Sequence, residues 1–222
     1  MSVPDSITTA TSAPPRRRLT QQERSAATRQ ALLDATIESL IELGYEKSTT
    51  SEISERALLS RGAHQHHFET RAKLFAAAVE RLAMRSYEEL ERELELLQRG
   101  PDHRRDVLDV LWRTFNGPLY QVVVDLSVHA RTDPELRVSL EPLEQMMSER
   151  AMPLMRRYFD GPVDEAELGS LLVMTLATIR GLVLLRVLQP GYDRERAWRD
   201  CRTRLLAMIE AEPRRADPGA EI

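Results

Sequence analysis

The stretch TTSEISERALLSRGAHQHHF, residues 49–68, contains two short helical patterns separated by a break. Thr49 or Thr50 can cap the first pattern, and Ser60 can cap the second, which we predict to span residues 61–67. About three residues join the two helices, which is the arrangement of a helix-turn-helix. Spacing predicts that this unit buries the apolar side chains of Leu40, Ile53, Leu59 and Phe68.

The second predicted helix carries side chains suited to DNA. Its first turn has Arg61, which can recognise guanine, followed by Gly62 and Ala63, which are too small to hold the backbone away from a groove floor. Its later turn has short polar groups that can donate hydrogen bonds to phosphates. These groups belong to Gln65, His66 and His67.

A metal site is the alternative interpretation of three histidines within four positions. His66 and His67 are adjacent, so on a helix they point about 100° apart and cannot share one ion, whereas His64 and His67 could. A stable zinc site needs a third or fourth ligand, and the single cysteine, Cys201, is far away in the sequence. No partnered nucleophile accompanies the histidines either. We therefore expect no metal, no cofactor and no catalytic residue.

Composition places the chain among helical proteins. Of its 222 residues 42% are hydrophobic, 30% are charged and 5% are aromatic. This length supports one or two domains, and the long runs of Leu, Ala, Arg and Glu predict an all-α fold. With one cysteine no internal disulfide can form, and the first twenty residues lack the apolar core of a secretory signal. We expect a cytoplasmic protein.

The apolar stretch over residues 171–188 is nearly long enough to cross a membrane. It contains Arg180 and Arg186, and each would cost about 2.5–3.5 kcal/mol near the centre of a bilayer. We therefore predict a buried helix of a soluble protein and no membrane partner.

Charge is divided unevenly along the chain. Residues 1–85 contain 12 basic and 10 acidic side chains, and the remainder contains 19 basic and 25 acidic ones. The part that holds the histidines is the more basic, which favours an anionic partner there.

We predict two folded domains flanked by two tails. A flexible basic arm is expected over residues 1–19, a helix-turn-helix domain over 20–70, a larger helical domain over 71–212 and a C-terminal tail over 213–222. A long helix over residues 71–97 would link the domains. The first helix is expected over 28–43 with Gly44 as its C-cap, and later helices near 105–116, 118–131, 134–159, 164–188 and 194–210.

Residues 28–80 closely resemble the N-terminal DNA-binding domain of the TetR/AcrR family of bacterial transcriptional regulators. The resemblance rests on motifs at fixed offsets, namely the Gly44-Tyr45 exit from a helix, the short helix around Ile53, and a Ser60-x-Gly62 pattern followed by His67-Phe68. It implies that Thr50, Ser51, Gln65, His66 and His67 contact DNA phosphates and that Arg61, Gly62 and Ala63 face base edges.

Two positions depart from the family pattern. Leu58 stands in the turn where the family usually has glycine, although a leucine tolerates positive φ poorly. The pair His64-Gln65 stands where the family usually has an aliphatic residue followed by tyrosine. Which of these two residues faces the core of the small domain is left open.

For the larger domain the resemblance implies a homodimer that binds a small-molecule effector. The apolar side chains that could line an effector pocket, or form ordinary core, are Trp112, Phe115, Tyr120, Met147 and Met155, with Thr178 as a polar neighbour. The predicted helix over 164–188 is apolar on more than one face, so one face can meet a partner. The residues that we expect at the dimer interface are Leu172, Leu176, Gly181 and Leu205.

These observations predict a non-enzymatic, dimeric transcriptional regulator. The most direct form is a repressor that a small, largely apolar effector releases from a near-palindromic DNA operator. An activator or a ligand-independent regulator of the same fold is the first alternative. A helical metal-binding or ligand-binding protein, or an enzyme, without DNA function is the second.

Overall fold

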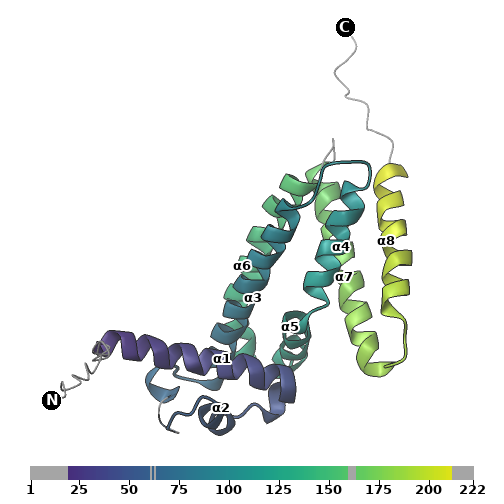
Figure 1. Cartoon of the computed structure of the whole chain (residues 1–222). Coiled ribbons are helices and arrows are strands. Elements are labelled where there is room, and N and C mark those ends of the chain that lie inside the picture. Colours follow the sequence, from purple (N-terminus) through teal and green to yellow (C-terminus); the bar gives the residue numbers. More distant parts are fainter. Residues whose placement is uncertain (1–19, 61, 63, 160–163, 212–222) are drawn as a thin grey trace, which may run out of the picture.

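The computed structural model describes residues 20–60, 62, 64–159 and 164–211, and within these ranges the chain is helical with no β-strand. This confirms the all-α prediction (Figure 1). The helices are α1 (Gln21–Lys47), α2 (Thr50–Arg56), α3 (Arg71–Glu95), α4 (His103–Phe115), α5 (Pro118–Ala130), α6 (Pro134–Tyr158), α7 (Glu165–Leu188) and α8 (Arg194–Ala211), with a single 3-10 turn, η1, over His64–His66. The predicted arm over 1–19 and the tail over 213–222 lie outside the described residues.

Helix α1 begins seven residues earlier than the apolar pattern predicted, because a capping box starts it. Thr20 accepts a hydrogen bond from the Glu23 N–H, and the Glu23 carboxylate accepts one from the Thr20 N–H. Residues 21–27 supply no apolar periodicity, so the sequence pattern missed this turn. At the other end Gly44 has φ 74°, which breaks the helix where the C-cap was expected.

The small domain consists of α1, α2, η1 and the start of α3. Its predicted core residues Leu40, Ile53 and Phe68 are buried, and Leu59 packs against them while remaining partly exposed. This core continues into the larger domain, because side chains of α5 and α6 pack against α1 and α3. Figure 1 shows α1 lying across the lower end of α3, beside α5.

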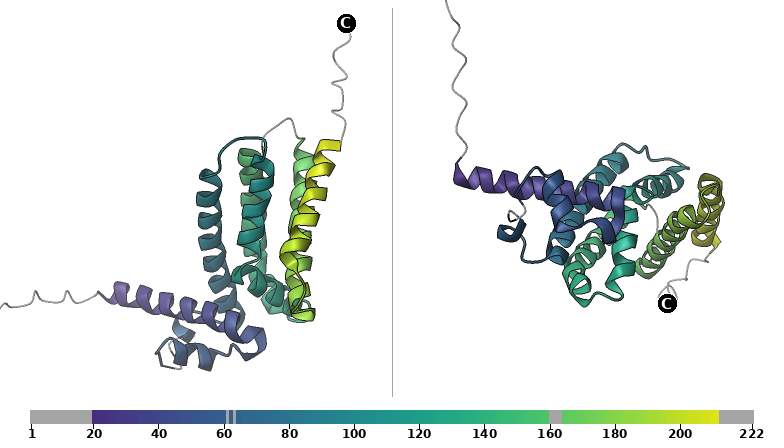
Figure 2. Two further views of the ribbon diagram at one scale, coloured as in Figure 1. Left: turned by 45° about the vertical axis from the view of Figure 1, so that its right-hand side comes forward. Right: turned by 90° about the horizontal axis from the view of Figure 1, so that it is seen from below.

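The larger domain is a bundle of upright helices, with α3 and α6 on one side and α7 and α8 on the other (Figures 1 and 2). Two stacked tryptophans fasten α4 to α8. The rings of Trp112 and Trp198 lie 5.1 Å apart and nearly parallel, at 7°. Trp112 donates to the Glu195 carboxylate at 3.1 Å, and Trp198 donates to Asp109 Oδ1 at 2.7 Å. Each buried indole therefore has a hydrogen-bond acceptor on the opposite helix.

Helix α7 is the one described helix that is long and apolar enough to cross a membrane, over Glu165–Leu185. Part of it belongs to the core of the larger domain, where Leu168, Ile179 and Val183 are buried. Its opposite face carries large apolar side chains that the described residues leave exposed. These are Val173, Met174, Leu184, Val187 and Leu188.

Candidate nucleic-acid interface

Helix α2 is held firmly against α1, and its N-terminus stays accessible. Thr49 is the N-cap and accepts from the Glu52 N–H at 3.2 Å. The buried Ser39 hydroxyl of α1 contacts both the Glu52 carboxylate and Ser48 Oγ. Ser51 is exposed and Thr50 is half-buried in the first turn, so both can reach a phosphate as the family resemblance implies.

The turn after α2 contains the only described non-glycine residue with positive φ. Leu58 has φ 56°, and its side chain is 93% exposed. Its N–H donates to the Glu55 carbonyl at 3.0 Å, and the next N–H, of Leu59, donates to the Ser54 carbonyl at 2.9 Å. The turn therefore has the backbone shape for which glycine is suited, with leucine in its place.

We call residues 61–67 the recognition segment. Its described part differs in structure from the helix predicted there. Arg61 and Ala63 lie outside the described residues, and the described part is the single 3-10 turn over His64–His66. The His67 and Phe68 N–H groups both donate to the His64 carbonyl, at 3.0 and 2.8 Å. The prediction from the Ser60 cap is therefore wrong over residues 64–66, because a short sequence containing Gly62 and three histidines has low helix propensity.

The side chains of this segment divide into an outer and an inner set. Gln65 and His66 are exposed, and His67 is half-buried. His64 is half-buried with its Nδ1 atom inside the protein, so His64 and not Gln65 faces the core. Phe68 is buried, and the Arg29 guanidinium of α1 lies 5.1 Å from the centre of its ring.

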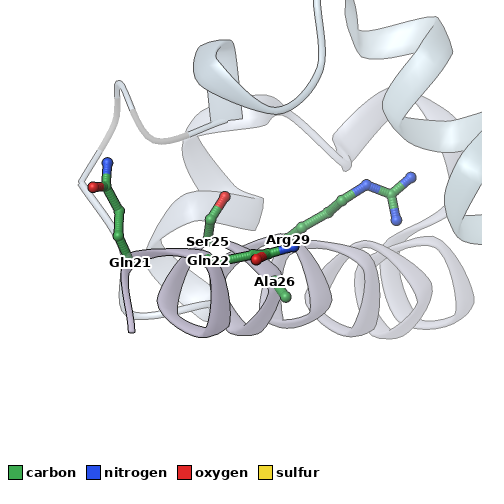
Figure 3. A pocket seen from close by; sticks show the side chains of 5 residues that line it. All are labelled: Gln21, Gln22, Ser25, Ala26 and Arg29. Atoms are coloured by element: carbon green, nitrogen blue, oxygen red, sulfur yellow. The ribbon is translucent and has the colours of Figure 1, made fainter. Parts of the chain in front are cut away.

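A shallow hollow of about 550 Å³ lies on the first turns of α1. Gln21, Gln22, Ser25, Ala26 and Arg29 line it, and Figure 3 shows their side chains arising from neighbouring turns of this helix. The motif search missed Arg29, because its partner Phe68 is 39 residues away along the chain.

Chemically, the exposed surface formed by α2 and the recognition segment offers hydrogen-bond donors. Glu69, the nearest carboxylate after the segment, pairs with Lys73, and this hydrogen bond lowers the pKa of Glu69. Among the described residues no group of three His, Cys, Asp or Glu side chains could hold a metal ion. The surface is suited to contacts with an anion such as a phosphate.

The residues predicted to line an effector pocket lie together in the core of the larger domain. Trp112, Phe115, Tyr120 and Met155 are buried, while Met147 and Thr178 are half-buried at the edges. Burial raises the pKa of Tyr120, whose hydroxyl accepts a hydrogen bond from Arg180. The Thr175 hydroxyl is buried there without a described partner, and the sequence pattern did not single it out.

The predicted dimer residues are distributed differently. Leu172 and Leu205 lie in the core of their own protomer, and Leu176 is half-buried against it. Gly181 is exposed, and a Cβ atom added there would meet nothing within 4 Å. The uncovered face of α7 instead presents Val173, Met174 and Leu184. Sequence alone could not separate the two faces, because apolar residues lie on almost every side of this helix.

Comparisons with known proteins point to one family. Residues 32–78 match the family described as bacterial regulatory proteins, tetR family. An uncharacterized HTH-type transcriptional regulator of Mycobacterium tuberculosis is 32% identical over 122 residues, which are 55% of this chain and 63% of that protein. The HTH-type transcriptional regulator CymR of Pseudomonas putida is 33% identical over 57% of this chain and 62% of its own length. The chain thus spans less than two thirds of these relatives.

A solved structure shares the fold over most of the chain. The multidrug binding protein EbrR, crystallised with imidazole, superposes with a TM-score of 0.56 over 84% of this chain and 97% of its own, at 19% identity. The family match covers the helix-turn-helix, and the structural match covers most of the chain. Over residues 32–78 the chain is similar to the tetR family of bacterial regulatory proteins, and its helical fold is similar to that of the solved structure.

Proposed function

We propose that this protein is a DNA-binding transcriptional regulator that acts as a dimeric repressor in the cytoplasm. The observation that supports DNA binding best is the surface formed by the α2 N-terminus and the recognition segment. Ser51, Gln65 and His66 are exposed there with their polar groups outward, while Ile53 and Phe68 anchor the same elements in the core. Such a rigid, donor-rich surface suits a DNA groove and its phosphates.

The dimer is supported by the uncovered face of α7. Five large apolar side chains stay exposed along one helix of the protomer. A second copy that packs its own α7 and α8 against this face would bury them. The same packing would hold two recognition segments on one DNA molecule, which a specific site requires.

Release by a small, largely apolar molecule is supported by the core of the larger domain. Trp112, Phe115, Tyr120 and Met155 are gathered there among leucine and valine side chains, and the buried Thr175 hydroxyl has no described partner. Methionine adapts to irregular apolar shapes, and one polar group can orient a ligand. The ligand-bound conformation would have to hold the recognition segments at a spacing that DNA does not accept.

Two alternatives remain distinguishable by experiment. An activator or ligand-independent regulator would bind DNA in the same way, and only transcription in the presence and absence of the protein separates it from a repressor. A helical metal-binding or ligand-binding protein or enzyme without DNA function would bind no specific sequence.

The test is a fluorescence anisotropy titration of purified protein against DNA enriched from a random pool. We expect binding that persists in a chelator and weakens steeply as salt rises, because phosphate contacts release counterions. Equal affinity for enriched and random DNA, or binding that the chelator abolishes, would contradict the proposal.

A further inference from the structure

Tyr45 lies where the DNA-binding helices meet the larger domain. Gly44 turns the chain out of α1 with φ 74°, and this directs Tyr45 toward the corner between α5 and α6. The Tyr45 N–H donates to Asp125 Oδ2 at 2.8 Å, and its hydroxyl donates to Asp133 Oδ2 at 2.6 Å. A single residue of the small domain is therefore hydrogen-bonded at both ends to the larger one.

The Tyr45 ring is held as closely as its polar atoms. It stacks on His129 of α5, with ring centres 4.3 Å apart and planes inclined by 24°. The Arg71 guanidinium lies 4.2 Å from the centre of the same ring. Arg71 begins α3, and it also donates to the Tyr45 carbonyl and, at 3.1 Å, to the Ser48 carbonyl. We call these five residues, Tyr45, Arg71, Asp125, His129 and Asp133, the Tyr45 junction.

The partners of Tyr45 in the larger domain are themselves part of the α5–α6 corner. Asp133 is the N-cap of α6, and its second oxygen, Oδ1, accepts from the Leu136 N–H at 3.0 Å. Asp125 Oδ1 lies 3.5 Å from His129 Nε2, one turn along α5. A shift of the corner would therefore displace both acceptors of Tyr45 and its stacking partner together.

We propose that Tyr45 is a positioning residue that fixes the angle of the DNA-binding helices against the larger domain, and that movement of the α5–α6 corner reaches the DNA-binding surface through it. This inference rests on the proposed function. Helix α3 already links the two domains covalently. The Tyr45 junction adds a direct contact between the end of α1 and helices α5 and α6. A protomer whose angle is fixed in advance loses less freedom when two copies bind one DNA site.

The decisive experiment uses two DNA duplexes. One is the site enriched from random DNA, and the other is the same site with one base pair inserted at its centre, which moves the half-sites by about 3.4 Å and rotates them by roughly 35°. Tyr45→Phe keeps the stacked ring and removes only the hydroxyl bond to Asp133. We expect its affinity for the enriched site to fall about tenfold and its affinity for the altered site to change less than about twofold.

Tyr87→Phe is the matched control. The Tyr87 hydroxyl donates to the Met147 carbonyl at 3.2 Å, and this bond joins α3 to α6 without involving α1 or α2. The control loses one buried tyrosine hydroxyl as well, and we expect it to bind both duplexes like the unaltered protein. Circular dichroism melting checks that both variants are folded.

A second measurement reports the angle itself. A spin label at Ala27→Cys on the exposed part of α1, with Cys201→Ser removing the native thiol, gives the distance between the two protomers of the dimer. We expect one narrow distance distribution, which Tyr45→Phe broadens and Tyr87→Phe leaves unchanged.

The outcomes separate the inference from the function on which it rests. Equal loss of affinity on both duplexes, or an unchanged preference between them with an unchanged distance distribution, would overturn the role of Tyr45. Absence of specific binding by the unaltered protein would overturn the proposed function instead.

Discussion

Leu58 is the residue whose backbone conformation fits its side chain least. It has φ 56° and is almost fully exposed, so its side chain gains little from packing to offset the strain. The left-handed conformation costs an L-residue about 1–2 kcal/mol, and glycine adopts it freely at a smaller entropic cost. We predict that Leu58→Gly raises the free energy of unfolding by up to about 1 kcal/mol in urea denaturation.

The neighbouring position is the control for this prediction. Ala57 has φ −74°, so Ala57→Gly relieves no strain and should lower the free energy of unfolding. If both glycine variants were destabilised to the same degree, the strain at Leu58 would be refuted.

At the proposed DNA-binding surface, we predict that one substitution lowers affinity for all sequences and that another also lowers sequence selectivity. His66→Ala removes an exposed polar group and should weaken binding to every sequence by a similar factor. Arg61→Ala should cost about 1–3 kcal/mol on the enriched site and relax selectivity at one or two base pairs. Titration against a panel of single-base variants measures both effects. An equal loss for Arg61→Ala on every sequence would assign that arginine to phosphates only.

Tyr45, which is half-buried, and Tyr87, which is buried, predict a loss of stability in alkali. Burial raises the pKa of Tyr45 and of Tyr87 from 10.0 to about 12, and the hydrogen bond to Asp133 adds to the effect at Tyr45. The folded state holds these two protons more tightly than the unfolded state. Their contribution to the free energy of unfolding is therefore complete below pH 10 and is lost as pH rises through 12. The free energy of unfolding should fall over this interval, and less steeply in a Tyr45→Phe, Tyr87→Phe double variant. Identical slopes would disprove the assignment.

At the scale of single helices, Gly181 allows the proposed interface to be tested without disturbing the protomer. A side chain added there meets nothing within 4 Å, and replacing a helical glycine should favour the helix by up to about 1 kcal/mol. We predict that Gly181→Leu leaves the melting of the fold intact, and that light scattering shows more monomer because the added side chain separates the partner's helix.

Gly100→Leu is its counterpart outside α7. That glycine also has open space around it and lies in the connection between α3 and α4. We expect the Gly100→Leu protein to remain dimeric. A fully dimeric Gly181→Leu protein with unchanged DNA affinity would move the interface away from this face of α7.

Most helices were predictable from sequence because periodicity and end signals agree within them. Thr49, Thr70 and Asp164 cap helices in the structure, and glycine or proline marks several of the other boundaries. The recognition segment was not predictable in detail, because its polar residues carry no apolar period. The Ser60 cap predicted a regular helix, where the described part is one 3-10 turn.

The functional residues were predictable only where the residues in contact lie close together in the sequence. The exposure of Gln65 and His66 followed from the motif, but the choice of His64 for the core required the structure. The bonds of Tyr45 to Asp125 and Asp133 join residues 80 and 88 positions apart, and no spacing rule reaches that far. The two faces of α7 differ only in what packs against them, which composition does not record.

At the scale of the whole molecule, DNA recognition depends on two protomers held at one spacing. A single recognition segment contacts too few base pairs to define a site, so two must fit successive major grooves about 34–36 Å apart. In the proposed dimer, helix α7 provides the face for the partner, while α3 and the Tyr45 junction connect the larger domain to the DNA-binding helices. We therefore expect DNA specificity, dimerisation and the effector response to depend on the same connected elements, α7, α3 and the Tyr45 junction.

The measurement that tests the account most directly is repeated selection of a random DNA pool by the purified protein, followed by sequencing. We predict enrichment of a near-palindromic sequence, with half-sites about one helical turn apart, in the presence of a chelator. A pool that stays random, or an enrichment that disappears when metal is removed, would contradict it.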